Sequence, residues 1–267
     1  MRAQTHSIRN THNRREAIIQ MLQQNRRVNV SELSQTFHIS QVSIRHDLDY
    51  LERIGVALRV HGGARLSPAL QQMPQFDARL LKDVKAKAAI GKAAAGLILP
   101  GQTILLDSGT TVLEVARNIP PPLLEDGDLT VVTRSLAIAS ELRKYRRIRL
   151  VVLGGMYLSE YDAFVGAQVE QALQGLHVHT LFIGTEGILP ERGLTSDNLL
   201  EANLYPHLAK VADQVVVVAG SAKFGVNKLQ TMLPTTAIQC LITDCNTAES
   251  YVQALREIGV EVTVVPC

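Results

Sequence analysis

Seven short runs of valine, isoleucine and leucine recur over the last two thirds of the chain and constrain its fold more than any other feature. The runs are Thr103–Leu106, Leu129–Val132, Ile148–Leu153, Thr180–Ile183, Val215–Val218, Cys240–Thr243 and Val260–Val265. Most of them do not alternate apolar with polar residues, so the runs are expected to be strands buried on both faces, as in a parallel sheet. Stretches with helical spacing separate the runs, among them Lys82–Leu97 and Val112–Asn118. The pattern predicts a mostly parallel α/β domain over residues 79–267.

Residues 1–66 differ in composition from the rest of the chain. They contain ten arginines, no lysine and five acidic residues, a net charge of +5, whereas the whole 267-residue chain carries +2. The remaining residues therefore carry −3. A small basic segment attached to a mildly acidic body is typical of a DNA-binding module joined to a second domain.

The basic segment has the spacing of a winged helix-turn-helix, which we predict for residues 1–66. Helices are expected at 14–24, 32–37 and 41–54, with Ser31 and Ser40 as the N-caps of the second and third. Two short extended runs, 56–60 and 64–66, flank His61-Gly62-Gly63, which is the pattern of a hairpin turn and would form the wing. Residues 67–78 contain two prolines and three glutamines and show neither the helical nor the strand periodicity of apolar residues, so we expect a linker there.

One face of the third predicted helix carries residue types that read DNA. Arg45 can donate two hydrogen bonds to a guanine, and Val42 can contact a thymine methyl group. Gln41 and Ser43 lie near the helix N-terminus, where they suit a phosphate. The predicted DNA-binding residues are Gln41, Val42, Ser43, Arg45 and His46 on this helix and Arg59, His61 and Arg65 on the wing. Double-stranded operator DNA is the expected partner.

Polar, glycine-rich turns follow the predicted strands of the C-terminal domain. Asp107-Ser108-Gly109-Thr110-Thr111 follows the first strand and opens a helix, where small residues, hydroxyl groups and the helix dipole suit a phosphate. Similar positions are Thr133-Arg134-Ser135, Gly154-Gly155, Gly166, Gly184–Gly187, Glu201 and Ser221–Gly225. Because an open α/β sheet binds ligands beyond the carboxyl ends of its strands, these turns predict a ligand site.

Two stretches, Ser40–Glu52 and Arg59–Ala64, resemble the DeoR family of bacterial sugar-catabolism repressors, and the resemblance extends from residue 14 to residue 265. It implies a C-terminal domain similar to the ribose-5-phosphate isomerase and CoA-transferase fold, with a phosphorylated sugar as the ligand. By this resemblance Asp107, Gly109, Thr110 and Thr111 would hold the phosphate or adjacent hydroxyls, and Thr133, Glu186, Glu201 and Lys223 would line the sugar. Neither a cofactor nor enzymatic activity is expected.

The chain departs from the family pattern at several positions. Ser43 replaces the usual threonine, and His46 replaces an arginine or lysine, so one positive charge becomes dependent on pH. In the C-terminal domain Gly220 and Glu186 occupy positions that are usually aspartate, and Leu158 and Pro206 occupy positions that are often basic. The operator sequence and the identity of the effector therefore stay open.

Composition excludes other classes of protein. No apolar run reaches the ~18–20 residues that span a bilayer, and the first residues lack a hydrophobic signal core, so a cytoplasmic location is expected. The cysteines, Cys240, Cys245 and Cys267, are odd in number and lack histidine neighbours. This argues against a disulfide framework or a metal site and for reduced thiols.

Two alternatives to the ligand-controlled regulator stay open. The chain could be a sugar-phosphate isomerase or deaminase, in which Asp107, Glu186, Glu201 and Lys223 supply acid and base groups. It could instead be a DNA-binding oligomer with a vestigial effector pocket. Helix-turn-helix proteins usually read paired half-sites, so a homo-oligomer, either a dimer or a tetramer, is expected for a regulator.

Overall fold

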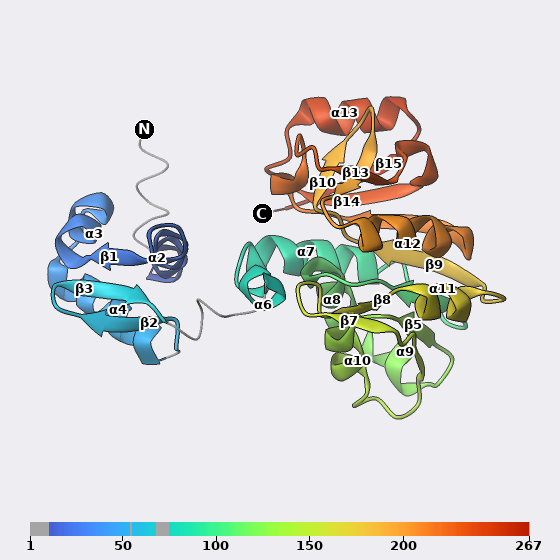
Figure 1. Cartoon of the computed structure of the whole chain (residues 1–267), viewed down its shortest axis with the longest axis horizontal. Coiled ribbons are helices and arrows are strands. Elements are labelled where there is room, and N and C mark those ends of the chain that lie inside the picture. The colour runs from blue at the N-terminus through green and yellow to red at the C-terminus, as the bar shows by residue number, and fades with distance from the viewer. Residues whose placement is uncertain (1–10, 54, 68–74, 267) are drawn as a thin grey trace. The chain divides into compact units, whose positions relative to one another are not determined.

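A computed structural model of the chain describes residues 11–53, 55–67 and 75–266 (Figure 1). The chain forms two compact units, an N-terminal unit of residues 1–78 and a C-terminal unit of residues 79–267. Each unit has its own hydrophobic core, as is typical of separate domains.

The N-terminal unit is a winged helix-turn-helix, as predicted. Its elements are α2 (Thr11–Asn25), β1 (Arg27–Asn29), α3 (Val30–Phe37), α4 (Gln41–Arg53), β2 (Ala57–Val60) and β3 (Gly63–Leu66). β2 and β3 form the predicted hairpin, and β1 pairs with β3 to complete an antiparallel sheet. Gly63 allows this pairing, because a Cβ there would lie 2.0 Å from the carbonyl oxygen of Val28. Leu22, Leu33 and Leu48 belong to the buried core of this unit.

The start of α3 differs from the prediction. The helix begins at Val30, and its N-cap is Asn29, whose side-chain oxygen accepts a hydrogen bond from the backbone N–H of Ser31 at 3.0 Å. Asparagine and serine are about equally good N-caps. The prediction of Ser31 as the cap is therefore wrong because Val30, which is buried, is already part of the helix.

The start of α4 agrees with the prediction. Ser40 Oγ accepts a hydrogen bond from the backbone N–H of Ser43 at 3.1 Å, which confirms Ser40 as a capping residue. The last described residue of the helix is Arg53, and Ile54, its predicted end, lies outside the described residues. Gly55 follows with φ +76°, the left-handed conformation that glycine favours after a helix.

A buried carboxylate connects α2 to α4. Asp47 on α4 is 1% exposed and accepts hydrogen bonds from Nε of Arg14 at 2.6 Å and from Nε of Arg15 at 2.8 Å. The Arg15 guanidinium also lies 3.9 Å from the ring centroid of Tyr50 on α4, a cation–π contact. Because a buried charge is costly without its partner, these contacts hold α4 in one orientation relative to α2.

The C-terminal unit is built on a parallel sheet of seven strands. All seven predicted strands are present, as β4 (Thr103–Leu106), β5 (Thr130–Thr133), β6 (Arg149–Val152), β9 (Val178–Ile183), β12 (Ala212–Val218), β14 (Cys240–Asp244) and β15 (Glu261–Val265). Their order is β15-β14-β12-β9-β4-β5-β6, and every pairing is parallel. The edge strands are not buried on both faces, however: Val152 on β6 is 45% exposed and Val264 on β15 is 40% exposed. An apolar run identifies a strand without showing whether it lies at an edge.

Helices connect these strands. They are α6 (Gln75–Leu80), α7 (Val84–Ala95), α8 (Thr110–Arg117), α9 (Pro121–Glu125), α10 (Leu136–Leu142), α11 (Ala167–Leu173), α12 (Leu199–Lys210) and α13 (Glu249–Glu257). α7 and α8 pack closely because Gly91 has no side chain; a Cβ there would lie 2.6 Å from the backbone of Glu114. Residues 75–78, predicted as the end of the linker, belong to α6, and residues 68–74 lie outside the described part of the chain.

Two smaller antiparallel sheets have no counterpart among the predicted strands. One contains β10 (Gly187–Leu189), β11 (Gly193–Ser196) and β13 (Gln230–Leu233), and the other is the hairpin of β7 (Met156–Leu158) and β8 (Ala163–Val165). Each of these strands has three or four residues, too few for a sequence pattern to separate them from loops. Two 3₁₀ helices, η1 (Ser221–Lys223) and η2 (Thr235–Ala237), complete the unit.

The cysteines are not all in the expected state. Cys240 is a buried free thiol, and burial raises its pKa to about 11. Cys245, in contrast, is disulfide-bonded. The expectation of reduced thiols is therefore wrong for Cys245, because the pairing of cysteines does not follow from their spacing in the sequence.

A buried arginine joins the carboxyl ends of two central strands to α12. Arg134, which follows β5, is 0% exposed, and its Nε contacts the carboxylate of Asp107 after β4. Its terminal nitrogens donate to both carboxylate oxygens of Glu201 on α12, at 2.7 and 2.8 Å, and to Ser108 Oγ at 3.0 Å. The second oxygen of Asp107 accepts from the hydroxyl of Tyr205 on α12 at 2.6 Å. We call these five residues the Arg134 network.

Charge compensation keeps this network stable although it is removed from water. Burial raises the pKa of Glu201, and the neighbouring Arg134 opposes that rise. Burial also raises the pKa of Tyr205 well above its ordinary value, so its hydroxyl stays protonated as the donor to Asp107. Removal of one partner from a set of this kind leaves an uncompensated buried charge.

Arg134→Met is predicted to lower the free energy of unfolding of the C-terminal unit by about 3–5 kcal/mol at pH 7.5, because two carboxylates stay buried without a cation. The pKa of Glu201, already raised by burial, is expected to rise further once the guanidinium is gone. The folded state then binds protons more readily than the unfolded state, so the loss becomes smaller as the pH falls toward 5.5. Denaturant unfolding followed by circular dichroism at both pH values measures the effect.

Arg117→Met is the matched control. Arg117 pairs with Glu114 and Glu141, and its side chain is 43% exposed. Its replacement is expected to cost about 0–1 kcal/mol at either pH, as is usual for surface pairs. A loss of that size for Arg134→Met, or a loss that does not change with pH, would contradict the role assigned to the network.

Candidate functional site

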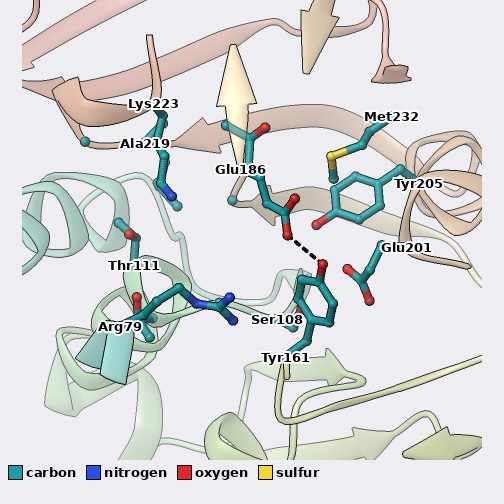
Figure 2. A pocket seen from close by; sticks show the side chains of 16 residues that line it. Arg79, Ser108, Thr111, Tyr161, Glu186, Glu201, Tyr205, Ala219, Lys223 and Met232 are labelled. Atoms are coloured by element: carbon teal, nitrogen blue, oxygen red, sulfur yellow. Dashed lines mark hydrogen bonds between the residues drawn. The ribbon is translucent and has the colours of Figure 1, made fainter. Parts of the chain in front are cut away.

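A pocket lies at the carboxyl ends of neighbouring central strands in the C-terminal unit (Figure 2). Its walls come from the turns after β4, β9 and β12, and from α6, the β7–β8 loop, α12 and β13. The lining residues are Arg79, Ser108, Gly109, Thr110, Thr111, Tyr161, Gly184, Thr185, Glu186, Glu201, Tyr205, Val218, Ala219, Gly220, Lys223 and Met232. This is the edge at which open α/β sheets bind ligands.

Most of the predicted effector residues are brought together at this pocket. Six of the eight line it, namely Gly109, Thr110, Thr111, Glu186, Glu201 and Lys223. Asp107 and Thr133 do not. Asp107 is fully buried with its oxygens occupied by Arg134 and Tyr205, and buried Thr133 accepts a hydrogen bond from the N–H of Ser135 at 3.0 Å. The structure therefore corrects the expected direct contacts of these two residues: they support the turns that line the pocket.

The turn between β4 and α8 lines one side of the pocket. Gly109, the N-cap of α8, has φ +120°, a conformation that residues with a Cβ rarely adopt. Thr110 and Thr111 form the first turn of α8. The first N–H groups of a helix have no acceptors within the helix, and the helix dipole adds partial positive charge there. The turn can therefore receive an anion such as a phosphate.

Two cationic side chains, Lys223 from η1 and Arg79 from α6, point into the pocket (Figure 2). Burial and the nearby Arg79 lower the pKa of Lys223, whereas Glu186 opposes the shift. Arg79 donates to the carbonyl oxygen of Glu160 at 2.6 Å, and its guanidinium lies 5.4 Å from the ring centroid of Tyr161. An anion in the pocket would stabilise both positive charges.

Three donors fix Glu186 at the pocket wall. Its Oε1 accepts from the hydroxyl of Tyr161 at 2.5 Å, as Figure 2 shows, and its Oε2 accepts from Ser196 Oγ at 3.1 Å and from the N–H of Asp197 at 3.0 Å. Burial and Glu186 raise the pKa of Tyr161, so its hydroxyl stays a donor. A carboxylate has about four acceptor sites, which leaves Glu186 able to accept a further hydrogen bond from a ligand hydroxyl.

The surroundings of position 220 favour glycine over the aspartate that is usual there. A Cβ on Gly220 would lie 3.3 Å from Oδ2 of Asp244. Burial opposes ionisation of Asp244, but hydrogen bonds from the N–H groups of Ser221 and Asn246 prevail and lower its pKa. A carboxylate is therefore already present beside this turn, and an aspartate at position 220 would be repelled by it. Of the other departures in this unit, Glu186 lines the pocket and Leu158 and Pro206 do not.

Several lining residues were not predicted to belong to the site. Arg79, Tyr161, Tyr205 and Met232 lie in four segments that are far apart in the sequence, and only the fold brings them together. A signal for the buried Arg134 does exist. Two carboxylates at predicted strand ends and helix starts require a cation once they are buried, and Arg134 lies in one of the predicted turns.

The predicted DNA-reading residues of α4 form an exposed face. Gln41, Val42, Arg45 and His46 are exposed, Val42 by 57%, and Ser43 is half-buried. A terminal nitrogen of Arg45 lies 3.4 Å from Gln41 Oε1. This long hydrogen bond leaves the Arg45 guanidinium available for a base edge.

The side chains of the predicted DNA-binding residues on the wing differ in how many contacts hold them in place. Arg59 is held in place, since its Nε lies 3.1 Å from a carboxylate oxygen of Asp49 on α4 and a terminal nitrogen donates to the carbonyl oxygen of Gly63 at 3.0 Å. His61 and Arg65, in contrast, are exposed. Arg59 therefore connects the wing to α4, and Arg65 is the wing arginine best placed to reach a phosphate.

Within the described ranges, no helix is both long and apolar enough to cross a membrane. The same residues contain no group of three histidine, cysteine, aspartate or glutamate side chains arranged to hold a metal ion. The ring of His177 lies 2.8 Å from Asp213 Oδ1 at the surface, as a solvated side chain would.

Two family models match the chain. The DeoR-like helix-turn-helix domain matches residues 14–68, and the DeoR C terminal sensor domain matches residues 82–245. The first covers the winged helix-turn-helix, and the second covers the turns that line the pocket.

Related proteins match over nearly their whole length. A protein of Escherichia coli O157:H7 named as an aga operon transcriptional repressor is 35% identical over 96% of this chain and 94% of its own. The HTH-type transcriptional regulator GolR of Listeria innocua is 31% identical over 94% of this chain and 97% of its own. The HTH-type transcriptional repressor GlcR of Bacillus subtilis is 30% identical over 93% and 94%.

Solved structures resemble the chain more distantly. Ribose 5-phosphate isomerase A of Methanocaldococcus jannaschii is 17% identical, with a TM-score of 0.40 over 54% of this chain and 55% of that one. These values carry no conclusion about the site. The two domain models and the full-length relatives are decisive: the chain belongs to the DeoR family of helix-turn-helix transcriptional regulators.

Proposed function

We propose that the protein represses a carbohydrate-catabolic operon and that a phosphorylated sugar in the pocket of the C-terminal unit controls its binding to operator DNA. One observation carries the ligand class: the start of α8 and two cations, Lys223 and Arg79, line the same pocket. The family resemblance supports the carbohydrate class. Such a regulator acts where the chromosome is, so we place it in the cytoplasm.

The phosphate would bind at the start of α8. Backbone N–H groups and the hydroxyls of Thr110 and Thr111 would donate to its oxygens, and Lys223 and Arg79 would supply opposite charge. Gly109 allows close approach because it has no side chain. The roles of Gly109, Thr110 and Thr111 follow the prediction from sequence, whereas Lys223 was expected to line the sugar and Arg79 was not predicted.

The sugar hydroxyls would bind at the carboxylates of the pocket. Glu186, fixed by Tyr161 and two further donors, has acceptor capacity left. Glu201 also lines the pocket, although Arg134 already holds its two oxygens. Carboxylates that are held in place in this manner discriminate hydroxyl positions well, because they need not be reordered on binding.

The two units would have separate functions. We propose that residues 1–66 bind DNA and that residues 79–267 bind the effector and form the oligomer, with the segment 67–78 between them. Exposed Arg45 and Val42 would read bases in the major groove, and Arg65 would contact a phosphate. The orientation of α4, set by buried Asp47, would fix which residues reach the bases.

A sugar-phosphate isomerase or deaminase is the second candidate, and the geometry disfavours it. This alternative gives acid–base roles to Asp107, Glu186, Glu201 and Lys223, and catalysis by a carboxyl group would need one that is free to accept and release a proton. Asp107 is buried with both oxygens engaged, Glu201 binds Arg134 through both oxygens, and Glu186 accepts from three donors. We therefore propose a regulator without enzymatic activity, which turnover of a bound sugar phosphate would disprove.

We also propose that the protein is a homodimer or a larger symmetric assembly. A single helix-turn-helix buries too little surface for tight, specific binding, and paired half-sites require paired units. Sedimentation at micromolar concentration should therefore show at least a dimer. A monomer, both with and without operator DNA, would contradict this proposal.

Arg45→Ala is predicted to weaken operator binding by about 1–3 kcal/mol and to relax the preference for one base pair, because a bidentate contact to a guanine is lost. Binding to the operator and to operators mutated one base pair at a time measures both effects. The matched control is Arg65→Ala, which should weaken all sequences alike and reduce the salt dependence by about one phosphate contact. Unchanged affinity and base preference in Arg45→Ala would show that this residue does not read the operator.

The ligand class is tested by thermal unfolding of the full chain against a panel of free sugars and their phosphates. A ligand at 100 times its Kd should stabilise the protein by about 2.7 kcal/mol. Gly184→Val is predicted to abolish that stabilisation, because the new side chain would occupy the pocket. The backbone has room for a Cβ at this position, whose nearest neighbours would lie 3.9 Å away, and the melting temperature of Gly184→Val without ligand checks that the variant folds.

Each outcome of the panel supports or contradicts the proposed ligand site. Stabilisation by a sugar phosphate but not by the free sugar supports the phosphate site. If no compound stabilises the wild-type protein, the pocket is vestigial and the proposed ligand class is wrong. If Gly184→Val is stabilised as much as the wild type, the ligand binds elsewhere.

A further inference from the structure

The helix α6 carries the chain from one unit into the other. It spans Gln75–Leu80, and the N-terminal unit ends at Ala78 while the C-terminal unit begins at Arg79. The last two residues of α6, Arg79 and Leu80, therefore belong to the unit that holds the pocket. In the sequence, the winged helix-turn-helix precedes this helix.

Arg79 extends from this helix to the pocket. Its guanidinium donates to the carbonyl oxygen of Glu160 at 2.6 Å and lies over the ring of Tyr161, whose hydroxyl donates to Glu186. Figure 2 shows the Arg79 side chain directed into the same space as that of Lys223. One contact to Glu160 leaves other N–H groups of the guanidinium for a ligand, since arginine has five.

A lysine of the next helix holds the end of α6. The Nζ of Lys87 on α7 donates to the carbonyl oxygens of Arg79 and Lys82. Burial lowers the pKa of Lys87 to about 8; Asp83 opposes this shift, and Lys223 and Arg79 add to it. Three positive groups thus lie close together around the end of α6 and the pocket, and an anion bound there would relieve their mutual repulsion.

We propose that Arg79 is both a ligand-binding residue and the contact through which a bound phosphate acts on the DNA-binding unit. The inference rests on the proposed function, because it assumes an anionic ligand in the pocket. A phosphate that binds Arg79 and the start of α8 together favours the position of α6 in which both contacts are made. Since α6 joins the units, the ligand then biases the segment that carries the winged helix-turn-helix.

Lys223 is the matched comparison. It is a cation of the same pocket, but it lies on η1, within the C-terminal unit and far along the chain from α6. Both residues should contribute to ligand affinity. Only Arg79 should contribute to the change in operator affinity once every pocket is filled, because only Arg79 lies on the connecting helix.

The experiment uses the full chain as wild type, Arg79→Gln and Lys223→Gln. The probe is the sugar phosphate that stabilises the wild type most, and inorganic phosphate serves as a second probe. The dissociation constant of the probe is first measured for each protein without DNA. Operator affinity is then measured without probe and at 100 times each protein's own probe dissociation constant, so that weaker binding is compensated.

Both variants should bind the probe more weakly than the wild type. At saturation, Lys223→Gln should lose operator affinity by the same factor as the wild type, a factor of about 5–150 for typical coupling. The operator affinity of Arg79→Gln should stay nearly the same when the probe saturates the protein, a factor near 1. Arg79→Lys, which keeps the charge but not the planar fork of donors, should give an intermediate factor.

A full wild-type factor in saturated Arg79→Gln would overturn the inference. Unchanged probe affinity in Arg79→Gln would also overturn it, because Arg79 would then not bind the ligand. These results differ from failure of the proposed function, in which no sugar phosphate stabilises the wild type at all.

Discussion

The architecture of the C-terminal unit depends on one fully buried guanidinium. Arg134 binds carboxylates that follow β4 and lie on α12, and it is itself placed by the end of β5. Three members of its network, Ser108, Glu201 and Tyr205, also line the pocket. The contacts that stabilise the fold therefore also set the geometry of the site. A shift of α12 would also move the pocket wall, because protein interiors are tightly packed.

The same network determines the electrostatic character of the pocket. Asp107 and Glu201 share the single positive charge of Arg134, and Glu186 is held by the uncharged donors Tyr161, Ser196 and the N–H of Asp197. The positive groups, by contrast, are the start of α8, Lys223 and Arg79. A pocket whose carboxylates are held by hydrogen bonds and whose cations are available favours an anionic ligand with hydroxyl groups.

The elements that can be predicted from the sequence are those with a strong pattern of apolar residues or glycines. The central strands follow from continuous apolar runs, and the wing follows from extended runs on either side of two glycines. The short strands of the small sheets escape prediction because three or four residues show no period. At the site, the turns Gly109–Thr111 and Gly184–Glu186 follow from the rule that ligands bind at strand ends. Arg79 and Tyr161 do not, because tertiary packing alone places them there.

Two corrections show what local patterns leave undetermined. Asp107 has the residue type and position of a ligand contact, but its burial and its ion pair depend on Arg134 and Tyr205, which are remote in sequence. Asn29 precedes Ser31 as the cap of α3 because the buried position of Val30 sets where the helix begins. In both cases burial decides the outcome, and burial is a property of the folded chain.

Calorimetry can measure directly whether ligand binding in the pocket is coupled to operator binding. The stabilising sugar phosphate is titrated into the protein alone and into the protein–operator complex, and the operator is titrated with and without the sugar phosphate. Thermodynamic linkage requires both factors to be equal, and typical coupling makes them about 5–150. We predict that operator DNA weakens binding of the sugar phosphate by the same factor by which the sugar phosphate weakens binding of operator DNA. Equal affinity for the sugar phosphate with and without operator would contradict it.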